Sequence, residues 1–491
     1  MPRTRKDIWK LSSTDDTLKW YARAVAVMQK RPITDSTSWR YQAAIHGYDP
    51  QQDPFFNPAE KLPPQSEQDS YWLQCQHGSW FFFPWHRGYL HYFEDIVRAA
   101  IKDLGGPADT WALPYWNYSD SANPNARCLP PAFWDPKFPD GGPNPLLVKA
   151  RAGDANQGKP LGTDPDDIEL ATCMKKLGFI NSSSGAGSNF GGGRTGFSHR
   201  GGVPGSAELV PHGSMHDAVG GGDGWMDSFE TAALDPIFWI HHSNIDRLWE
   251  VWLQRDKRHT NPTLAAWLSS IDFDFHDASG APVTLKVNQV LDTKNPLLDY
   301  VYQDVSDPLG AAHPLVAAAE PSAPMEIERI PEMVGASDAQ PITLGPQPHS
   351  VEFAVKEPTG PGAMARMARG PAAAPEVHLN LENITAEARP IQAYTVYVNL
   401  PDGANPDNYP QLKAGRLPRF GIVEASRQSK EHAGDGMNVS FEISHIVDAL
   451  KQAKSWDPKR LRVTFVPRDN TGAAALNTKP VKVGRISLYY A

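Results

Sequence analysis

Histidines are the residues of this chain whose type and spacing best fit a chemical site, because imidazole nitrogens bind transition metals. His212 and His216 are four residues apart. On a short helix both rings would point the same way and could hold one metal ion. His241 and His242 lie in a segment rich in Trp and Ile, where an unpaired buried imidazole would cost free energy. We therefore predict a metal site built from histidines of several segments.

Two longer segments carry histidines in a specific pattern. The first is Cys75-Gln-His-Gly-Ser-Trp-Phe-Phe-Phe-Pro-Trp-His-Arg-Gly-Tyr-Leu-His-Tyr-Phe-Glu94 and the second is Asp235-Pro-Ile-Phe-Trp-Ile-His-His-Ser-Asn-Ile-Asp-Arg-Leu-Trp249. In this order they resemble the two copper motifs of tyrosinases, catechol oxidases and haemocyanins, the type 3 copper proteins. The likeness extends to Ser38–His46 and Leu113–Asn117, and so covers the whole N-terminal part of the chain.

The resemblance implies two copper ions, with dioxygen as co-substrate. The ligands that it implies are His46, His77 and His86 for the first copper and His212, His216 and His242 for the second. His241 would lie beside the second copper without binding it. Neutral imidazoles suit copper, and the absence of carboxylate ligands argues against magnesium, calcium and manganese. Zinc would accept the same ligands.

Three further residues match functional positions of relatives. Cys75 lies two residues before His77, where fungal and molluscan relatives join a cysteine to the histidine by a thioether; the alternative is a buried thiol. Glu208 matches a glutamate that is thought to hold a base water in monophenol-hydroxylating relatives, but the accompanying asparagine position is Gly213. Phe229 matches the bulky gate over the first copper in plant enzymes. Glu208 could instead be an ordinary helix N-terminal acid, and Phe229 could be plain core.

The elements that must position these residues are mostly helices. Helical spacing of apolar residues predicts helices over 15–30, 84–104 and 235–254, and Asp235 and Pro236 suit a helix start. Residues 135–211 are rich in Gly, Pro, Asp and Ser, which predicts a long surface connection. We expect residues 1–305 to form a mainly α catalytic domain, in which, as the resemblance implies, a four-helix bundle holds the dicopper centre.

The composition changes beyond about residue 305. Ala and Pro dominate up to Pro324, which predicts a linker over 306–335. Alternating apolar residues then predict an antiparallel β domain, a sandwich or barrel, over 336–491 with one short helix near 443–453. This domain resembles the C-terminal domain of plant and fungal polyphenol oxidases, which covers the active site and often inserts one placeholder side chain. The enzyme would then be latent until it is cut, near 312–324 or 360–375, or otherwise opened.

Composition excludes several other functions. The net charge of −9 and pI of about 6.0 do not favour nucleic acid, and no apolar run has the length of a membrane span. Only three cysteines and no apolar segment after the basic start indicate a cytoplasmic protein without a secretory signal. We expect small phenolic substrates and a possible homo-oligomer.

The function that the resemblance implies is the oxidation of o-diphenols to o-quinones, together with some ortho-hydroxylation of monophenols. Because Gly213 offers no side-chain acceptor for the base water, monophenol hydroxylation is the less certain of the two activities. Alternatives are an o-aminophenol oxidase, which the sequence does not separate from a phenol oxidase, and an oxygen carrier like haemocyanin.

Overall fold

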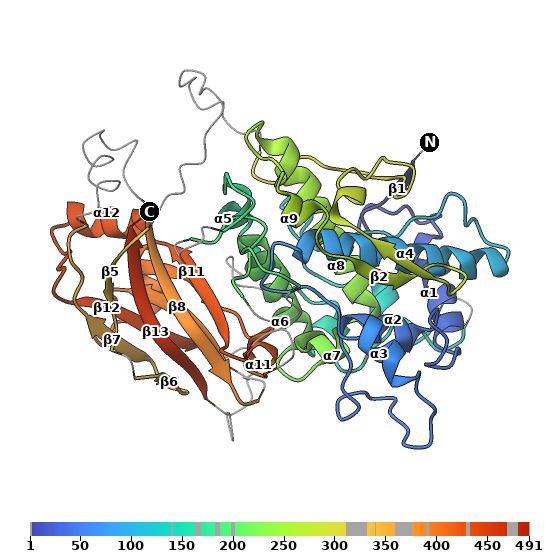
Figure 1. The fold of residues 1–491 in the computed structure, drawn as a ribbon, viewed down its shortest axis with the longest axis horizontal. Coiled ribbons are helices and arrows are strands. Elements are labelled where there is room, and N and C mark those ends of the chain that lie inside the picture. The colour runs from blue at the N-terminus through green and yellow to red at the C-terminus, as the bar shows by residue number, and fades with distance from the viewer. Residues whose placement is uncertain are drawn as a thin grey trace.

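The computed structural model describes residues 2–138, 141–162, 168–181, 187–197, 202–310, 331–338, 340–358, 376–388, 392–428, 433–468 and 480–490. A helical part and a β part lie side by side (Figure 1). Each part has its own hydrophobic core. The core of the helical part draws on residues from Ile8 to Tyr302, and the core of the β part on residues from Val334 to Tyr490. One residue of the C-terminal part, Phe420, belongs to the first core instead. Most of the predicted linker and both predicted cleavage segments lie outside the described residues.

The helical part contains the long helices that the apolar spacing predicts. Its helices are α1 (Thr17–Met28), α2 (Trp39–His46), α3 (Gln65–Tyr71), α4 (Phe82–Asp103), α5 (Leu170–Met174), α6 (Ser214–Gly220), α7 (Phe229–Ala232), α8 (Pro236–Arg255) and α9 (Ala265–Leu268). A wider helical turn, η4 (Glu208–Gly213), leads directly into α6. Helices α2, α4, α6 and α8 carry His46, His86, His216, His241 and His242, while His77 precedes α4 and His212 lies in η4.

Local sequence explains where these helices begin. The Ser38 hydroxyl accepts a hydrogen bond from the Tyr41 backbone N–H and caps α2, and the Asp235 carboxylate caps α8 in the same way at Ile237. Asp235 also forms a fully buried ion pair with Arg151, at 2.6 Å. Because an N-cap and a buried ion pair both fix Asp235, the start of α8 is held firmly against the preceding chain.

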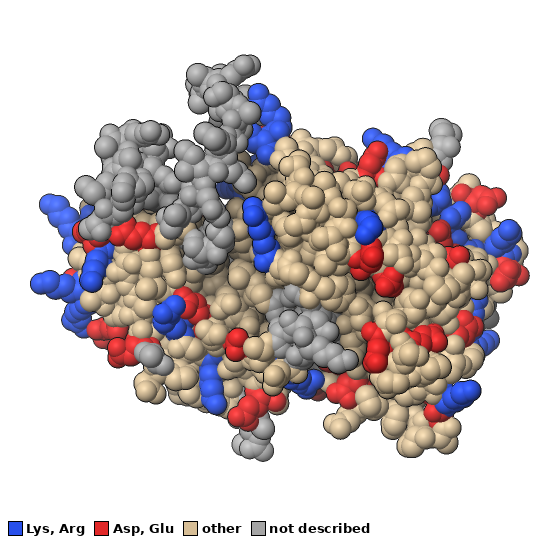
Figure 2. Space-filling model, in the orientation of Figure 1, with Lys and Arg blue, Asp and Glu red and all other residues tan. Residues whose placement is uncertain are grey.

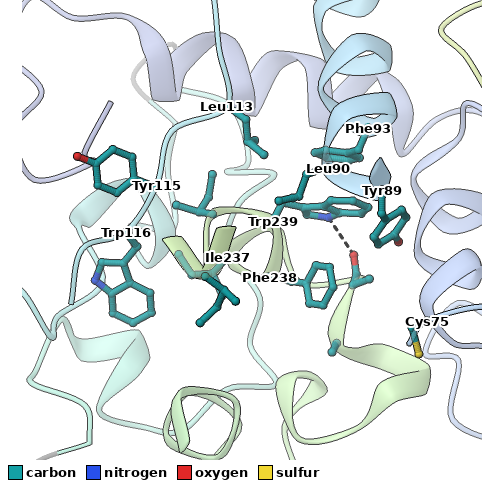
Figure 3. Packing of buried hydrophobic residues seen from close by; sticks show 14 of the residues in the cluster. Cys75, Tyr89, Leu90, Phe93, Leu113, Tyr115, Trp116, Ile237, Phe238 and Trp239 are labelled. Carbon is teal, nitrogen blue, oxygen red and sulfur yellow. Dashed lines mark hydrogen bonds between the residues drawn. The ribbon is translucent and has the colours of Figure 1, made fainter. Parts of the chain in front are cut away.

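Aromatic packing locks α4 against α8. The rings of Phe93 and Trp239 stack with centroids 3.4 Å apart, and the Trp239 indole N–H donates to the Ala233 carbonyl at 3.2 Å (Figure 3). Tyr89 also packs on Trp239, with ring centroids 4.7 Å apart. Burial of rings of this size accounts for much of the stability of such a core. The two helices that carry the copper motifs are thereby fixed relative to each other.

Part of the segment expected to be a surface connection is buried. Phe190 is fully buried and stacks on Phe83 of α4 at 4.8 Å and on Trp252 of α8 at 4.5 Å. Phe179 packs on Trp267 beside them. The prediction was wrong for this part because the abundant Gly, Ser and Asp outweighed two isolated phenylalanines, whose large apolar area draws the chain into the core.

The C-terminal part is the predicted β sandwich. The first sheet has the order β10-β9-β12-β7, and the second has the order β11-β8-β13-β5 with β6 also paired to β13; all these pairs are antiparallel. Their bounds are β5 (Glu332–Ala336), β6 (Ile342–Leu344), β7 (His349–Phe353), β8 (Val377–Ala386), β9 (Ala393–Val398), β10 (Lys413–Leu417), β11 (Met437–Glu442), β12 (Leu461–Arg468) and β13 (Val481–Tyr490). Helix α12 (Ser444–Gln452) is the short helix predicted near 443–453.

Short strands complete the helical part. Strand β1 (Arg3–Arg5) pairs in parallel with β4 (Tyr300–Tyr302), and β2 (Phe273–His276) pairs with β3 (Pro282–Leu285). The β1–β4 pair brings the buried Arg5 onto Glu94 of α4 and Asp246 of α8. The two ends of the helical part are thus tied to the two helices that carry the copper motifs.

The charge distribution and the helix lengths bear on two of the expectations drawn from composition. Acidic and basic side chains are interspersed on the face shown in Figure 2, which carries no large patch of basic residues. Within the part of the chain that the structure describes, no helix is both long enough and apolar enough to span a bilayer.

One small helix of the C-terminal part reaches toward the helical part. Helix α11 (Ile422–Ala425) follows strand β10 and lies at the junction of the two parts, near α6 and α7 (Figure 1). The residues just before it, Pro418 to Gly421, approach the histidine-bearing helices.

Candidate metal centre

Seven buried histidines from α2, α4, α6, α8 and adjoining turns meet in two groups. The groups are His46, His77 and His86, and His212, His216, His241 and His242. Within each group the candidate ligand atoms all lie within 4.8 Å of one another. The groups also touch each other, because the rings of His86 and His242 stack with centroids 4.5 Å apart. All six histidines that the sequence singled out as copper ligands are therefore brought together.

Backbone carbonyls orient most of these rings. Four rings each donate from Nδ1 to one backbone carbonyl. The pairs are His46 to Phe229 at 2.9 Å, His86 to Phe82 at 2.8 Å, His212 to Glu208 at 3.0 Å and His216 to Met226 at 2.7 Å. A carbonyl oxygen can only accept, so the proton must reside on Nδ1 and the Nε2 lone pair is left for another partner. Four imidazoles are therefore fixed in the tautomer that a metal bound at Nε2 requires.

The Nε2 atoms point toward one another. His77 Nε2 lies 3.3 Å from His46 Nε2, and His216 Nε2 lies 3.4 Å from His242 Nε2. The Nε2 atoms of His86 and His212 are buried with no hydrogen-bond partner among the described residues. Buried polar atoms without partners are costly, and several lone pairs facing one another repel. A metal ion between them would satisfy both conditions.

Burial also keeps the imidazoles neutral. The pKa values of His77, His86, His212, His216 and His242 are held well below the usual value for histidine, in each case first by burial and then by neighbouring imidazoles. Neutral imidazole is the form that binds metal. Because no carboxylate belongs to either group, the donor set suits copper and does not suit magnesium or calcium.

His241 is a member of the second group, but no backbone carbonyl of the described residues orients its ring. Its ring stacks face to face on His212 at 5.6 Å, and its pKa is lowered to about 3 by burial. Neither of its ring nitrogens has a hydrogen-bond partner among the described residues. It therefore packs against a candidate ligand, in the place expected for a residue beside the copper.

Phe229 lies over the first group of histidines. Its ring stacks on His77 with centroids 4.1 Å apart and lies 5.8 Å from His46, and its carbonyl is the acceptor that orients His46. The residue thus combines two tasks, since its side chain covers the metal-binding space while its backbone fixes a ligand. The gating role of Phe229 itself stays a prediction.

Glu208 contacts the first group although it lies beside the second in sequence. Its Oε1 accepts from His77 Nδ1 at 3.1 Å and from the Gly78 backbone N–H at 2.8 Å, while Oε2 is buried with no hydrogen-bond partner among the described residues. Burial raises the pKa of Glu208 to about 8, against the lowering effect of nearby backbone N–H groups. The carboxyl group therefore orients His77 and keeps one oxygen available.

A small cavity of about 30 Å³ adjoins Glu208. His77, His212, Gly213, Phe229 and Phe420 are among the residues that line it. Roughly 10–15 Å³ of such space suffices for one water molecule, so the cavity has room for water next to the carboxyl group. The water that the family resemblance implies has a place to bind.

Cys75 is fully buried and forms no disulfide with Cys128 or Cys173. It lies near Tyr89 (Figure 3), whose pKa is raised by burial first and by the proximity of Cys75 second. The thiol is therefore in the interior of the copper-motif region.

The residue that sequence reasoning missed is Phe420, which enters the metal centre from the C-terminal part. Its ring stacks on His216 with centroids 3.9 Å apart, and lies 5.5 Å from His212 and 4.7 Å from Phe229. Only 5% of it is exposed. The only local signal was one large aromatic residue between Pro418 and Gly421, a turn-like setting. Nothing in the sequence says which turn of a β domain reaches a site.

Arg419 holds this turn in place. Its backbone N–H donates to Asp217 Oδ2 at 3.0 Å, and its guanidinium Nη2 donates to the Asp217 carbonyl at 3.0 Å. The same guanidinium lies 3.5 Å from Asp227 Oδ1. All three side chains are buried. Asp217 directly follows His216, so the C-terminal part is attached next to a candidate metal ligand.

Comparison with known proteins agrees with this geometry. Residues 36–255 match the model of the common central domain of tyrosinase, residues 263–314 match the polyphenol oxidase middle domain, and residues 330–491 match a domain of unknown function, DUF7868. A tyrosinase of Hahella sp. (strain CCB-MM4), HcTyr1, is 37% identical over 99% of both chains. A chloroplastic polyphenol oxidase of Malus domestica is 29% identical over 96% of this chain and 75% of its own.

Solved structures agree as well. The structure of latent apple tyrosinase covers 100% of this chain and 97% of its own, with a TM-score of 0.61 and 25% identity. Recombinantly expressed latent aurone synthase, a polyphenol oxidase, covers 100% of this chain and 89% of its own, with a TM-score of 0.62. At 21% identity the second match shows the fold alone. Both solved chains are described as latent forms.

Proposed function

Because this chain belongs to the tyrosinase family of dicopper phenol oxidases, we propose that it oxidises o-diphenols to o-quinones with dioxygen as co-substrate. It also hydroxylates monophenols at the ortho position, at a lower rate. The observation that carries the proposal is the meeting of two buried histidine groups whose Nε2 atoms approach one another to 3.3 and 3.4 Å within the groups. Side chains alone offer no redox chemistry of this kind, whereas bound copper supplies electron exchange with dioxygen.

We assign three imidazoles to each copper. His46, His77 and His86 would hold the first ion and His212, His216 and His242 the second. The carbonyl-bound Nδ1 atoms support this assignment, because they leave Nε2 as the donor in His46, His86, His212 and His216. His241 would stay outside the ligand set and support His212 by stacking.

Phe229 and Glu208 would act on the substrate side. Phe229, stacked on His77, would limit the size of the phenol that enters and align its ring. Glu208 would hold His77 in orientation through Oε1, and a water in the adjoining cavity would pass the proton of a phenol hydroxyl to the other carboxyl oxygen. Because Gly213 offers that water no side-chain acceptor, we expect the activity on monophenols to be weaker than that on diphenols.

The arrangement in which Phe420 lies against the histidines would be the latent form of the enzyme. Phe420 occupies the space beside His216 and Phe229, where a phenol ring would have to lie in order to reach the metals. We therefore propose that the C-terminal part acts as a lid with Phe420 as its placeholder, and that activity requires displacement of the lid.

The test is oxygen uptake by copper-loaded protein, before and after limited proteolysis, with 4-methylcatechol, 4-methylphenol and 2-aminophenol. We expect rapid uptake with the catechol after proteolysis, slower uptake with the monophenol and little before proteolysis. Turnover of 2-aminophenol alone would contradict the proposal and indicate an o-aminophenol oxidase. Reversible oxygen binding without any turnover would replace it with oxygen carriage.

Two variants of α4 provide a matched control. His86→Ala removes a proposed ligand, and His91→Ala removes a buried imidazole of the same helix that lies outside both groups. We expect His86→Ala to lose both bound copper and activity, whereas His91→Ala should retain the copper content.

A further inference from the structure

The outer face of the second sheet of the β part is polar where it meets the helical part. Strand register places Asn380 of β8 beside Ser440 of β11, and Glu382 of β8 beside Arg485 of β13. Leu381, which lies between them in sequence and on the opposite face, belongs to the core. Polar side chains on a covered face cost free energy unless they are hydrogen-bonded, so a purely structural contact would favour apolar residues here.

A cavity of about 280 Å³ lies over this face. The four polar residues of the preceding paragraph line it together with Asn438 and Tyr489, and Val203 of the helical part lines it as well. The volume approaches the lower end, about 300 Å³, of cavities that hold small molecules, whereas one water molecule occupies only roughly 30 Å³. The junction of the two parts therefore has room for a small ligand.

Two contacts hold a segment of the helical part over this face. The Gly187 backbone N–H donates to the Ser440 hydroxyl at 3.1 Å, and Gly202 forms an isolated β-bridge with Met437 at the start of β11. Val203 directly follows Gly202 in the chain. The cavity is therefore bounded by both parts and is complete only while they are in contact.

The cavity carries many polar groups but no net charge. Arg485 Nη2 lies 2.6 Å from Glu382 Oε2, so the cation and the carboxylate among the described lining residues neutralise each other. The Asn438 Oδ1 accepts from the Asn383 backbone N–H at 2.9 Å, which leaves the Nδ2 hydrogens of Asn438 to donate elsewhere. Asn383 has a φ of 53° at a bulge between β8 and β11, and such bulges often re-aim side chains beside functional sites.

Tyr489 contributes an aromatic ring to the described lining. It lies on the same face of β13 as Arg485, four residues along the strand, and is half-buried. A charged ligand would find no unpaired ionic partner here, and an apolar ligand would leave the amide and hydroxyl groups without hydrogen bonds. A sugar ring suits this lining, because it offers neutral hydroxyl groups at its edge and an apolar C–H face to an aromatic ring.

We propose that this cavity binds a neutral monosaccharide, with Asn380, Asn438 and Ser440 as hydrogen-bonding residues and Tyr489 as the stacking ring. The site contains none of the histidines of the metal centre, so sugar binding requires no turnover. Because both parts bound the cavity, an occupied site stabilises their closed arrangement.

Calorimetry on the copper-loaded, uncut chain tests the proposal with the methyl glycosides of glucose, galactose, mannose and xylose. We expect at least one of them to bind with a Kd of about 1 mM or tighter. The methyl glycoside of glucuronic acid is the charged control, and because Arg485 is already paired with Glu382, it should bind no tighter than the best neutral sugar. The proposal is overturned if no neutral glycoside binds more tightly than about 10 mM, or if the glucuronide binds about tenfold tighter than all of them.

Two variants locate the binding. Asn438→Asp keeps the acceptor for the Asn383 N–H but removes the amide donor, and Tyr489→Ala removes the ring; each should weaken binding roughly three- to tenfold. Asn408→Asp is the matched control, because Asn408 is an exposed asparagine of the β part outside the cavity, and its affinity should equal that of the parent. Unchanged affinity in the Asn438→Asp, Tyr489→Ala double variant would overturn the proposal.

The neutral and charged glycosides are compared on the parent protein, so the proposal can be refuted even if a variant does not fold. No catechol enters the measurement. The sugar site and the proposed phenol oxidase function can therefore fail separately.

Discussion

Replacing Phe420 by alanine should convert the uncut chain from a latent to an active enzyme. The Phe420 ring is 5% exposed and contacts His216, His212 and Phe229. Truncation of a buried phenylalanine to alanine typically costs about 3–5 kcal/mol. On the lid proposal these contacts exist only in the closed state, so their loss acts directly on the closing equilibrium.

The magnitude follows from that cost. A loss of about 3 kcal/mol shifts an equilibrium roughly 100-fold, so even if half of it is recovered by relaxation, the open fraction should rise at least about tenfold. The vacated space would also admit a phenol ring without full opening. We therefore expect Phe420→Ala to raise the activity of the uncut protein on 4-methylcatechol by about 10- to 100-fold, and proteolysis to add little further activity.

The assay is the initial rate of oxygen uptake before and after limited proteolysis, with Phe465→Ala as the matched control. Phe465 is fully buried in the core of the β part itself, so its removal weakens the lid fold without emptying the metal centre. An equal rise in activity for Phe465→Ala would show that general unfolding of the lid is responsible. A Phe420→Ala protein that stays latent until it is cut, and is then fully active, would refute the placeholder role.

Further predictions concern the substrate side and the first copper. Phe229→Ala should raise kcat/KM for bulky catechols relative to 4-methylcatechol, and an unchanged ratio would remove its gating role. After limited proteolysis, Glu208→Gln should lower the ratio of the monophenol rate to the diphenol rate. An unaltered ratio would show that Glu208 only orients His77 and does not take part in proton transfer. Gly213→Asn should raise that ratio, because the asparagine side chain would offer the base water an acceptor. The substitution fits, since a Cβ at this position would meet nothing nearer than the Glu208 carbonyl at 3.4 Å and Pro418 Cβ at 3.8 Å. Copper loading in air should lower the intact mass by two hydrogens, because a Cys75–His77 thioether forms with loss of one S–H and one C–H hydrogen and dioxygen accepts the two electrons and two protons. A thiol that can still be alkylated after denaturation would exclude the bond.

The long helices could be predicted from the sequence because their information is local. The apolar stripe and the Gly-Gly-Pro stop predicted a helix over 84–104, and the structure has Phe82–Asp103. Asp235 and Pro236 predicted the start of the second helix, and Asp235 is indeed its N-cap. Caps and periodic burial depend on residues three or four positions apart, so a single sequence contains them in full.

Long-range contacts could not be predicted in this way. Glu208 reaches His77 across 131 positions, and the same carboxyl group could have faced solvent on a helix of identical sequence. Arg419 reaches Asp217 across 202 positions. Periodicity does not encode which turn of a β sandwich faces which helix, because that depends on how two separately formed surfaces fit together. For the same reason Phe420 did not stand out among the other buried aromatic residues.

The two adjacent residues of this turn contribute differently to lid closure. The Phe420 ring is apolar, and full burial of such a side chain stabilises by about 1.5–3 kcal/mol. The Arg419 guanidinium must lose its hydration to reach Asp217 and Asp227, and for buried ion pairs this desolvation offsets most or all of the attraction. Of these two residues, Phe420 therefore makes the larger favourable contribution, while Arg419 favours this register because it places a cation beside Asp217 and Asp227. The ring contact is therefore the part of this turn whose loss should favour opening most, and it is the contact that Phe420→Ala removes.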